Sequence, residues 1–176
     1  MPSGPFAHVC LLVKDLDQSV SDWTKILSVL DPEQLTDPIV KYDDFAGGAD
    51  RGMRWATFVA HHGCEIQLIQ PAPDTPLGER LEKLGEHVHH LCFTTPDVPG
   101  AMQKLAAQGI QLASGGQIFQ DPTMPWQHWG WVSHKSAHGV LLEIASPYES
   151  HQDAQWHPAG GAGRENGPVV PGDVPK

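Results

Sequence analysis

Basic residues are scarce in this chain of 176 residues. It has 11 Lys and Arg against 21 Asp and Glu, which gives a formal net charge of −10. Surfaces that bind nucleic acids or anionic membranes are built from clustered Lys and Arg. The composition therefore argues against both kinds of partner. An anionic substrate would need a local source of positive charge, such as a bound metal ion.

Cysteines and long apolar runs are also few. There are three Cys, none in a C-x-x-C arrangement, which is typical of a reduced compartment. No run approaches the ~18 consecutive apolar residues that a membrane span needs. The start of the chain, from Met1 to Pro5, lacks the charged and apolar regions of a signal peptide. We therefore expect a cytoplasmic protein with no membrane partner.

Two short patterns each occur twice. His8-Val9-Cys10-Leu11 and His90-Leu91-Cys92-Phe93 share the order His-apolar-Cys-apolar, at an offset of 90 − 8 = 82 residues. Residues 65–71 match residues 141–147 and place Gln67 over Glu143, at an offset of 143 − 67 = 76. Two repeats in the same order and at nearly the same offset indicate a duplicated module.

Hydrophobic periodicity predicts a strand, a helix and three further strands in each module. The strands are predicted at residues 6–13, 38–44, 53–60, 64–70, 87–95, 110–120, 128–135 and 139–145, and the two helices at about 15–30 and 98–108. Module 1 covers about 6–71, a linker with a short helix covers 72–86, and module 2 covers about 87–147. We predict an α+β domain over 1–147, in which two βαβββ modules form an open curved barrel around a metal site. Residues 148–176 contain a Gly- and Pro-rich stretch and are predicted to form a flexible tail.

Four polar residues occupy equivalent inward positions in these apolar strands: His8, Gln67, His90 and Glu143. A single histidine on a strand is more often a hydrogen-bonded core residue than a ligand, but the repetition favours a shared site. Two imidazoles, a carboxamide and a carboxylate suit one divalent ion of Co, Ni, Zn, Fe or Mn. With one carboxylate the site keeps a formal charge of about +1, which can stabilise an enolate or a bound anion.

Neighbouring residues leave several alternatives open. His89 competes with His90, but a side-chain period of two sends it to the opposite face of the strand. Cys10 and Cys92 are either ligands or small apolar fillers of the cavity floor. Glu65 shares a face with Gln67 and is a general base, an alternative ligand or a solvated residue at the strand end.

The segment 120–131 is unusually aromatic for a loop. Its tryptophans either form a lid over a substrate or cover an edge of the core, and its histidine either lines the mouth of a cavity or lies on the surface. We assign substrate binding to Trp126, His128, Trp131 and His134.

These motifs resemble the vicinal oxygen chelate superfamily, which includes glyoxalase I, methylmalonyl-CoA epimerase, extradiol dioxygenases and antibiotic-binding proteins. The matching stretches are residues 7–13, 65–71, 74–93 and 134–143, and their pattern is most similar to the epimerase. The resemblance implies metal ligands at His8, Gln67, His90 and Glu143. The epimerase pattern has a carboxylate on the strand that precedes Gln67's, whereas residues 52–59 contain no acid. The aromatic insert around Trp126 is also not typical of the epimerase.

We expect a metal-dependent isomerase, epimerase or lyase that abstracts a proton next to a metal-chelated carbonyl. Glu143 and Glu65 are the candidate bases. The expected partner is a small carbonyl acid or acyl thioester, and the chain is expected to form a homodimer. Two alternatives stay open: an Fe(II) dioxygenase of the same superfamily, and a non-catalytic protein that binds a small molecule.

Overall fold

The computed structural model describes residues 6–45, 48–60 and 63–160. Its main sheet has eight strands in the order β2-β3-β4-β1-β5-β8-β7-β6, and β9 pairs with β10 in a separate hairpin. The strands are β1 (Phe6–Leu12), β2 (Val40–Phe45), β3 (Met53–Phe58), β4 (Glu65–Gln70), β5 (His87–Thr94), β6 (Phe119–Gln120), β7 (His128–Val132), β8 (Leu141–Ala145), β9 (Tyr148–Ser150) and β10 (Trp156–Pro158). The α-helices of the described residues are α1 (Leu16–Leu30), α2 (Pro76–Leu84) and α3 (Val98–Ala107), and short 3-10 turns are η1 (Pro32–Leu35), η2 (Gly48–Asp50) and η3 (Ala113–Gly116).

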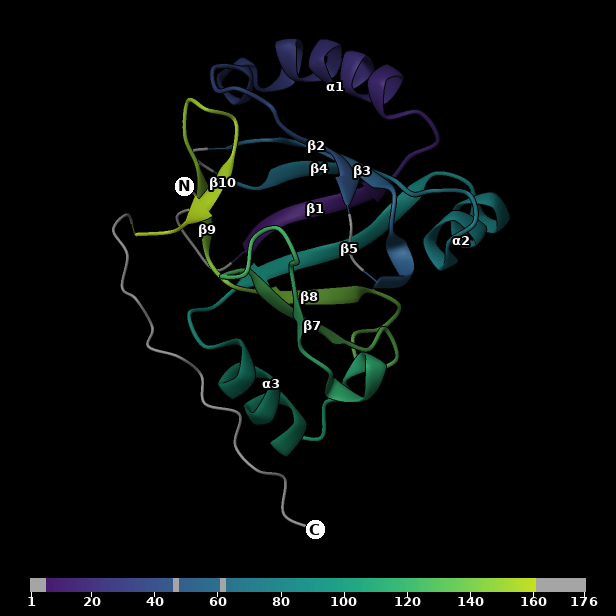
Figure 1. Ribbon diagram of the computed structural model, residues 1–176, viewed down its shortest axis with the longest axis vertical. Helices are drawn as coiled ribbons and strands as arrows, with labels where there is room; N and C mark the ends of the chain where they lie inside the picture. Colours follow the sequence, from purple (N-terminus) through teal and green to yellow (C-terminus); the bar gives the residue numbers. More distant parts are fainter. Residues whose placement is uncertain (1–5, 46–47, 61–62, 161–176) are drawn as a thin grey trace.

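The predicted α+β fold with two βαβββ modules is confirmed. The first strands of the modules, β1 and β5, lie side by side and antiparallel at the centre of the curved sheet (Figure 1). Their register is reciprocal, because His8 lies opposite Cys92 and Cys10 lies opposite His90. β4 runs parallel to β1, and β8 runs parallel to β5. This pairing brings the equivalent polar positions of both modules to one inner face.

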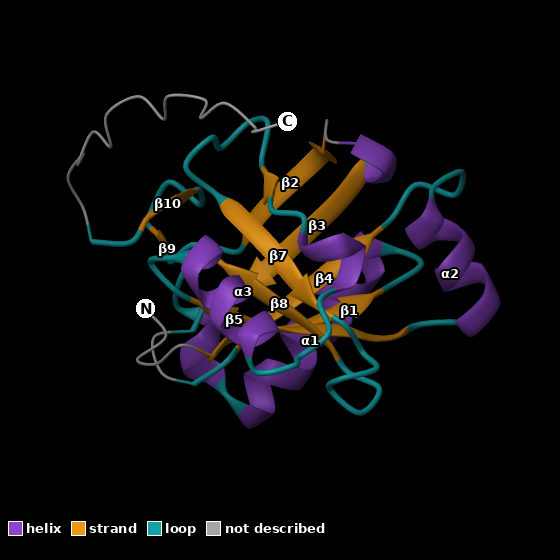
Figure 2. Ribbon diagram, turned by 90° about the horizontal axis from the view of Figure 1, so that it is seen from below, coloured by secondary structure: helices purple, strands orange, loops and turns teal. Residues whose placement is uncertain are grey.

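The helices α1 and α3 cover the outer face of the sheet at the two ends of the molecule (Figures 1 and 2). Asp15 caps α1 by accepting a hydrogen bond from the backbone N–H of Gln18, as expected for an N-cap aspartate. The buried stripe of α1 packs with Val13 and with outward side chains of β3 and β4, including Phe58 and Leu68, and Leu11 of β1 packs against the same cluster. The apolar outward face predicted for the first strand is therefore confirmed, and the inner face is left for the site.

The linker helix α2 packs on the other side of the sheet. Thr75 caps it, and its Leu81 joins an inner-face cluster with Cys10, Trp55 and Ile69. These side chains make the inner face apolar beside the polar ligand positions. The helix thereby closes one end of the inner cavity.

Residues 148–160, which the sequence assigned to a flexible tail, form the β9–β10 hairpin instead. Tyr148 is buried, and its ring lies 4.5 Å from that of Trp156. Packing of the buried Tyr148 against the partly buried Trp156 supplies a stabilising contact that local composition does not reveal. The rest of the predicted tail, residues 161–176, lies outside the described residues.

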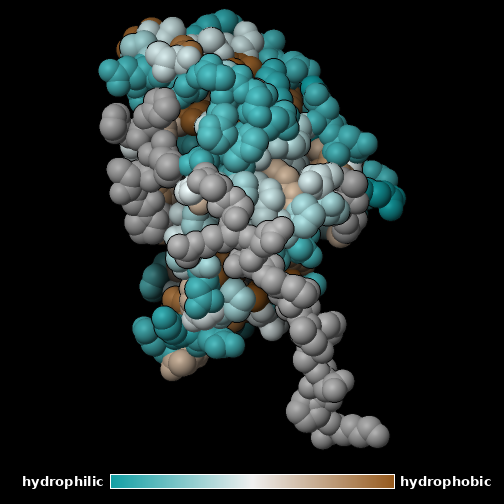
Figure 3. All heavy atoms as spheres, turned by 60° about the vertical axis from the view of Figure 1, so that its left-hand side comes forward, coloured by the Kyte–Doolittle hydropathy of each residue, from teal (hydrophilic) through white to brown (hydrophobic). Residues whose placement is uncertain are grey.

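One face of the molecule is mainly hydrophilic. Figure 3 shows the side that carries β9 and β10, where most of the coloured surface is hydrophilic and apolar side chains are scattered. In the part of the chain that the structure describes, no helix is both long and apolar enough to cross a membrane.

Candidate metal centre and its cavity

The inner face of the sheet encloses a cavity of about 170 Å³. All four predicted metal ligands line it: His8, Gln67, His90 and Glu143. They come from β1, β4, β5 and β8, the four central strands. The structure therefore brings the four residues together at the pseudo-symmetric positions expected from the duplication.

Three donor atoms of this set converge. The Nε2 atoms of His8 and His90 lie 3.1 Å apart, and Oε2 of Glu143 lies 3.5 Å from the first and 3.0 Å from the second. Ligand atoms at about 2.0–2.1 Å from a metal lie roughly 3.0 Å apart at a right angle and roughly 3.4 Å apart at a tetrahedral angle. The three spacings match those of donors that share one ion, so the residues fit a divalent metal.

The hydrogen bonds behind His8 orient its ring for such a role. The hydroxyl of Tyr148 donates to Oε2 of Glu65 at 3.0 Å and lies 2.7 Å from Nδ1 of His8. A hydroxyl has one proton, so Nδ1–H of His8 must be the donor in the second contact. The lone pair of His8 then sits on Nε2, towards His90 and Glu143. Metal-bound histidines are commonly held in this way through their other ring nitrogen.

His90 has a different partner. Its Nδ1 lies 2.8 Å from Nδ1 of His89, and His89 lines the cavity. The prediction that His89 points to the opposite face is wrong. Val88 pairs with Leu11 and His90 pairs with Cys10, so His89 is the extra residue of a β-bulge. A bulge breaks the alternation of faces and turns consecutive side chains to the same side.

The protonation states in the cluster suit metal ligands. Burial raises the pKa of Glu143, but its interactions with the neighbouring His90 and with His8 outweigh burial and hold the pKa well below its usual range. Burial lowers the pKa of His90, and burial with the neighbouring His90 lowers the pKa of His89 to about 3. A carboxylate anion beside a neutral imidazole is the form in which these side chains bind metals.

Glu65 lies behind the site. It is 1% exposed and is absent from the residues that line the cavity. Burial raises its pKa to about 7, against the hydrogen bond from Tyr148. This placement corrects its interpretation as a general base, because a carboxylate outside the cavity does not reach a substrate. In β4 it lies beside His8, and the hydroxyl of Tyr148 links its carboxylate to that ring.

The two cysteines are also buried behind the site. Cys10 and Cys92 are 0% exposed and do not line the cavity. Possible ligand atoms within 4.8 Å of one another do group Cys10 with His89 and His90, and Cys92 with His8 and Glu143. Burial raises the pKa of both thiols well above the usual value, which keeps them protonated. Their position away from the cavity favours the interpretation as apolar fillers.

Two of the four residues assigned to substrate binding line the cavity, Trp126 and Trp131. His128 and His134 do not, which corrects their assignment. In β7, Trp129 and Trp131 point inwards, so the alternation of the strand sends His128 to the other face. His134 is exposed on the turn after β7.

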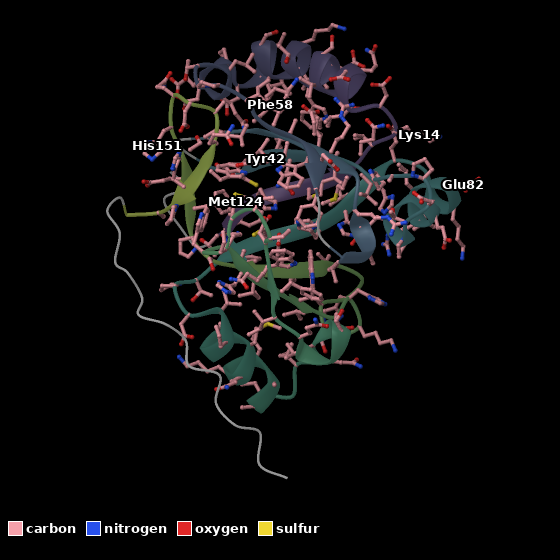
Figure 4. All side chains as sticks on the ribbon, viewed as in Figure 1. Lys14, Tyr42, Phe58, Glu82, Met124 and His151 are labelled. Atoms are coloured by element: carbon pink, nitrogen blue, oxygen red, sulfur yellow. The ribbon has the colours of Figure 1, made fainter. Side chains whose placement is uncertain are left out.

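The aromatic loop reaches across to module 1. Oδ1 of Asp121 accepts hydrogen bonds from the backbone N–H groups of Thr123 and Met124, which fixes the turn. Sδ of Met124 accepts a hydrogen bond of 3.5 Å from the hydroxyl of Tyr42 on β2 (Figure 4). The same hydroxyl accepts from the backbone N–H of Trp156 in β10. The loop and the C-terminal hairpin are thereby both linked to β2 through Tyr42.

Sequence reasoning missed Asp50. It lies in η2, directly before β3, and lines the cavity. One of its oxygens, Oδ1, is buried without a hydrogen-bond partner. Burial raises the pKa of Asp50, and a hydrogen bond with the backbone of Leu77 opposes that rise. An acid in the turn before the strand, rather than on it, is the only sequence signal that could have pointed to this residue.

Comparisons with known proteins agree with this architecture. The family model described as Glyoxalase/Bleomycin resistance protein/Dioxygenase superfamily matches residues 7–123. The chain belongs to this superfamily. A curated relative, the uncharacterized protein YqjC of Bacillus subtilis (strain 168), is 29% identical over 84 residues. That match covers 47% of this chain and 58% of the relative, so the chain spans little more than half the length of that protein.

Several proteins with solved structures share the fold. A methylmalonyl-CoA epimerase in complex with methylmalonyl-CoA and NH4+ is 21% identical with a TM-score of 0.61, over 81% of this chain and 94% of that one. The epimerase from Mycobacterium tuberculosis is 22% identical with a TM-score of 0.61, over 82% and 88%. A hypothetical protein from Bacillus halodurans C-125 is 17% identical with a TM-score of 0.64, over 85% and 98%. At these identities the likeness establishes the fold.

The Tyr148 hydroxyl offers a direct test of the positioning interpretation. We expect Tyr148→Phe to weaken Co²⁺ binding by roughly 10- to 100-fold, because such losses follow the removal of a partner of a metal-bound histidine. It should also destabilise the fold by about 1–3 kcal/mol, since Glu65 loses a buried hydrogen bond. Titration calorimetry and urea unfolding measure the two effects.

The matched control is Tyr42→Phe, which removes the hydroxyl of the other tyrosine of the chain. It should cost stability but leave the Co²⁺ affinity unchanged. Equal metal affinity in both variants and the unaltered protein would show that Tyr148 does not position His8.

Proposed function

We propose that the protein is a metal-dependent isomerase, epimerase or lyase that removes a proton from the carbon beside a carbonyl group. One observation carries the proposal. The donor atoms of His8, His90 and Glu143 converge at 3.0–3.5 Å in a cavity that also holds Gln67 and the unpaired carboxylate oxygen of Asp50. A cation site and a free acid in one cavity are what enolisation needs.

The ligand residues would hold one divalent ion. His8, His90 and Gln67 are neutral donors and Glu143 is the single anionic one, so the site keeps a formal charge of about +1. A divalent ion held there would act as a Lewis acid that polarises a substrate carbonyl and stabilises negative charge on its oxygen. Tyr148 and His89 keep the two imidazoles in place.

We assign the proton transfer to Asp50. Its Oδ1 has no protein partner, and its carboxylate is held by the backbone of Leu77. A pKa raised by burial moves the carboxylate closer to the range in which a base works well near neutral pH. Glu143 is the second candidate, but its depressed pKa makes it a weaker base. Asp50 would take the place of the carboxylate that the epimerase pattern has on the strand before Gln67's, where this chain has no acid.

Deuterium exchange tests the proposal. The full chain is loaded with Co²⁺ and incubated without air in D₂O with methylmalonyl-CoA and with small diones, and NMR follows the hydrogens next to the carbonyl. We expect deuterium to enter that carbon, and the rate to fall to background when a chelator removes the metal. Turnover that instead requires O₂ and Fe(II) would contradict the proposal and favour the dioxygenase alternative.

A second candidate is a protein that binds a small molecule without changing it. The observation that favours it is the aromatic lining, to which five of the six tryptophans contribute. In that case a ligand would quench tryptophan fluorescence at micromolar concentration, roughly −8 kcal/mol of binding free energy. No deuterium would then enter any ligand that binds.

A further inference from the structure

The wall of the cavity is aromatic and carries no positive charge. Five tryptophans line it together with Phe45 and Tyr148. Its charged residues are Asp50, Asp121 and Glu143, and no Lys or Arg stands among the lining residues that the structure describes. Apart from a metal ion in the proposed site, such a wall attracts apolar and aromatic groups and repels phosphates.

Two arginines close to this wall in the sequence form ion pairs with carboxylates. The side chain of Arg51, which follows Asp50 in the chain, is 76% exposed and lies 3.8 Å from Asp74. Arg54 forms ion pairs with Asp17 and Asp43 at 3.2 and 3.0 Å. A ligand with several phosphates would have to compete with these carboxylates for its counter-charges.

Buried polar atoms without partners mark where a ligand is recognised. Four side-chain atoms of the described residues are in this state, and three belong to residues of the cavity wall: Oδ1 of Asp50, Nε1 of Trp55 and Oε1 of Gln127. Native proteins satisfy nearly all buried polar groups. Trp55 is 7% exposed, so its indole N–H depends on a ligand atom or a water. A hydroxyl of a ligand can accept from this N–H.

The size of the cavity limits what fits. Its volume of about 170 Å³ is close to the ~150 Å³ of an apolar cavity that binds benzene. A six-membered ring therefore fits between the tryptophans, and because the cavity is open on one side the rest of the molecule does not have to fit within the same volume. The stacked pair of Trp55 and Tyr42, with ring centroids 4.8 Å apart, makes one wall rigid.

We propose that the substrate is a phosphate-free aromatic carbonyl compound, whose ring lies among the tryptophans and carries a hydroxyl that accepts the indole N–H of Trp55. The inference rests on the proposed function for the carbonyl end of the molecule. It departs from the acyl-CoA ligand of the epimerase structure described above. The tryptophans would then bind the ring, and the proposed metal site would bind the carbonyl group.

The test is titration calorimetry of the Co²⁺-loaded full chain with related probes. These are 1-phenylpropane-1,2-dione, its three hydroxyphenyl isomers, butane-2,3-dione, which lacks the ring, and methylmalonyl-CoA. We expect the phenyl dione to bind at least about tenfold tighter than butane-2,3-dione, because the ring buries apolar surface against aromatic side chains. The preference should persist in metal-free protein, since the tryptophans produce it.

Two variants locate the ring and the hydroxyl. Trp126→Leu should lower affinity for the phenyl dione, whereas Trp23→Leu, which alters the tryptophan packed on the outer core cluster, should not. At least one hydroxyphenyl isomer should bind tighter than the phenyl dione, and Trp55→Phe should abolish that gain of roughly tenfold.

Three results would overturn the inference: equal affinities for the phenyl dione and butane-2,3-dione, tighter binding of methylmalonyl-CoA, or no binding of any dione. If no hydroxyphenyl isomer binds tighter than the phenyl dione, or if Trp55→Phe keeps that gain in affinity, the hydrogen bond assigned to Trp55 is rejected. Deuterium exchange separates the two proposals. Exchange of methylmalonyl-CoA alone would reject the aromatic substrate and keep the proposed function. A ring preference without exchange of any probe would keep the ligand class and reject the proposed function.

Discussion

Replacing His90 with alanine is expected to lower the affinity for Co²⁺ by more than about 100-fold, because loss of a ligand exceeds the 10- to 100-fold typical of a supporting partner. Nε2 of His90 lies within 3.1 Å of both other converging donors, His8 and Glu143. Its removal leaves one imidazole, one carboxylate and the amide of Gln67, which are too few donors to hold the ion tightly. Elemental analysis after dialysis should find almost no metal, and metal-dependent exchange should stop.

His134→Ala is the control, since this exposed histidine lies outside the cavity. It should keep one metal ion per chain. If His90→Ala does not fold, as judged by circular dichroism, His90→Gln retains most of the volume and should show the same direction of change. Stoichiometric, tightly held metal in a folded His90 variant would contradict the assignment.

Asp50→Asn should slow deuterium exchange by about 10²- to 10⁴-fold, the usual contribution of a general base. The amide keeps the shape of the carboxylate but cannot accept the proton. Asp50 is not one of the proposed metal ligands, so Co²⁺ affinity should stay within about twofold. Asp74→Asn, at an exposed acid paired with Arg51, should leave the exchange rate unchanged.

The pH dependence gives a further sign of this role. The base works only when deprotonated, so the rate should fall as the pH drops through the pKa of Asp50. Burial raises that pKa above 3.8, so the acidic limb should lie above this value and should disappear in Asp50→Asn. A full exchange rate in this variant, with the limb intact, would reject Asp50 as the base.

The sequence alone predicted the fold and identified the four candidate metal ligands. His8 and His90 begin the same pattern, and Gln67 and Glu143 occupy matched places near the end of each module. A duplicated βαβββ unit pairs through its first strands, so these positions meet on one inner face. Repetition was informative here because duplicated segments fold into equivalent structures, which places their equivalent residues at equivalent positions.

The residues that sequence reasoning missed depend on tertiary contacts. His89 faces the cavity because of one bulge in the pairing of β5 with β1, which periodicity cannot foresee. Tyr148 lies beyond the last predicted strand and reaches His8 through a contact 140 residues apart in sequence. Asp50 sits in a turn, where no alternation marks the direction of a side chain. Glu65 was assigned to the correct face, but the pattern could not show that Tyr148 links its buried carboxylate to the ring of His8.

The central claim is that His8, Gln67, His90 and Glu143 hold one divalent ion. Anomalous X-ray diffraction from crystals of the full chain grown with Co²⁺ measures this directly. We predict a single strong peak within about 2.0–2.3 Å of Nε2 of His8, Nε2 of His90 and a carboxylate oxygen of Glu143, with the amide oxygen of Gln67 as the fourth protein ligand. A peak at Cys10 and His89 instead, or no peak in the cavity at saturating Co²⁺, would contradict the account.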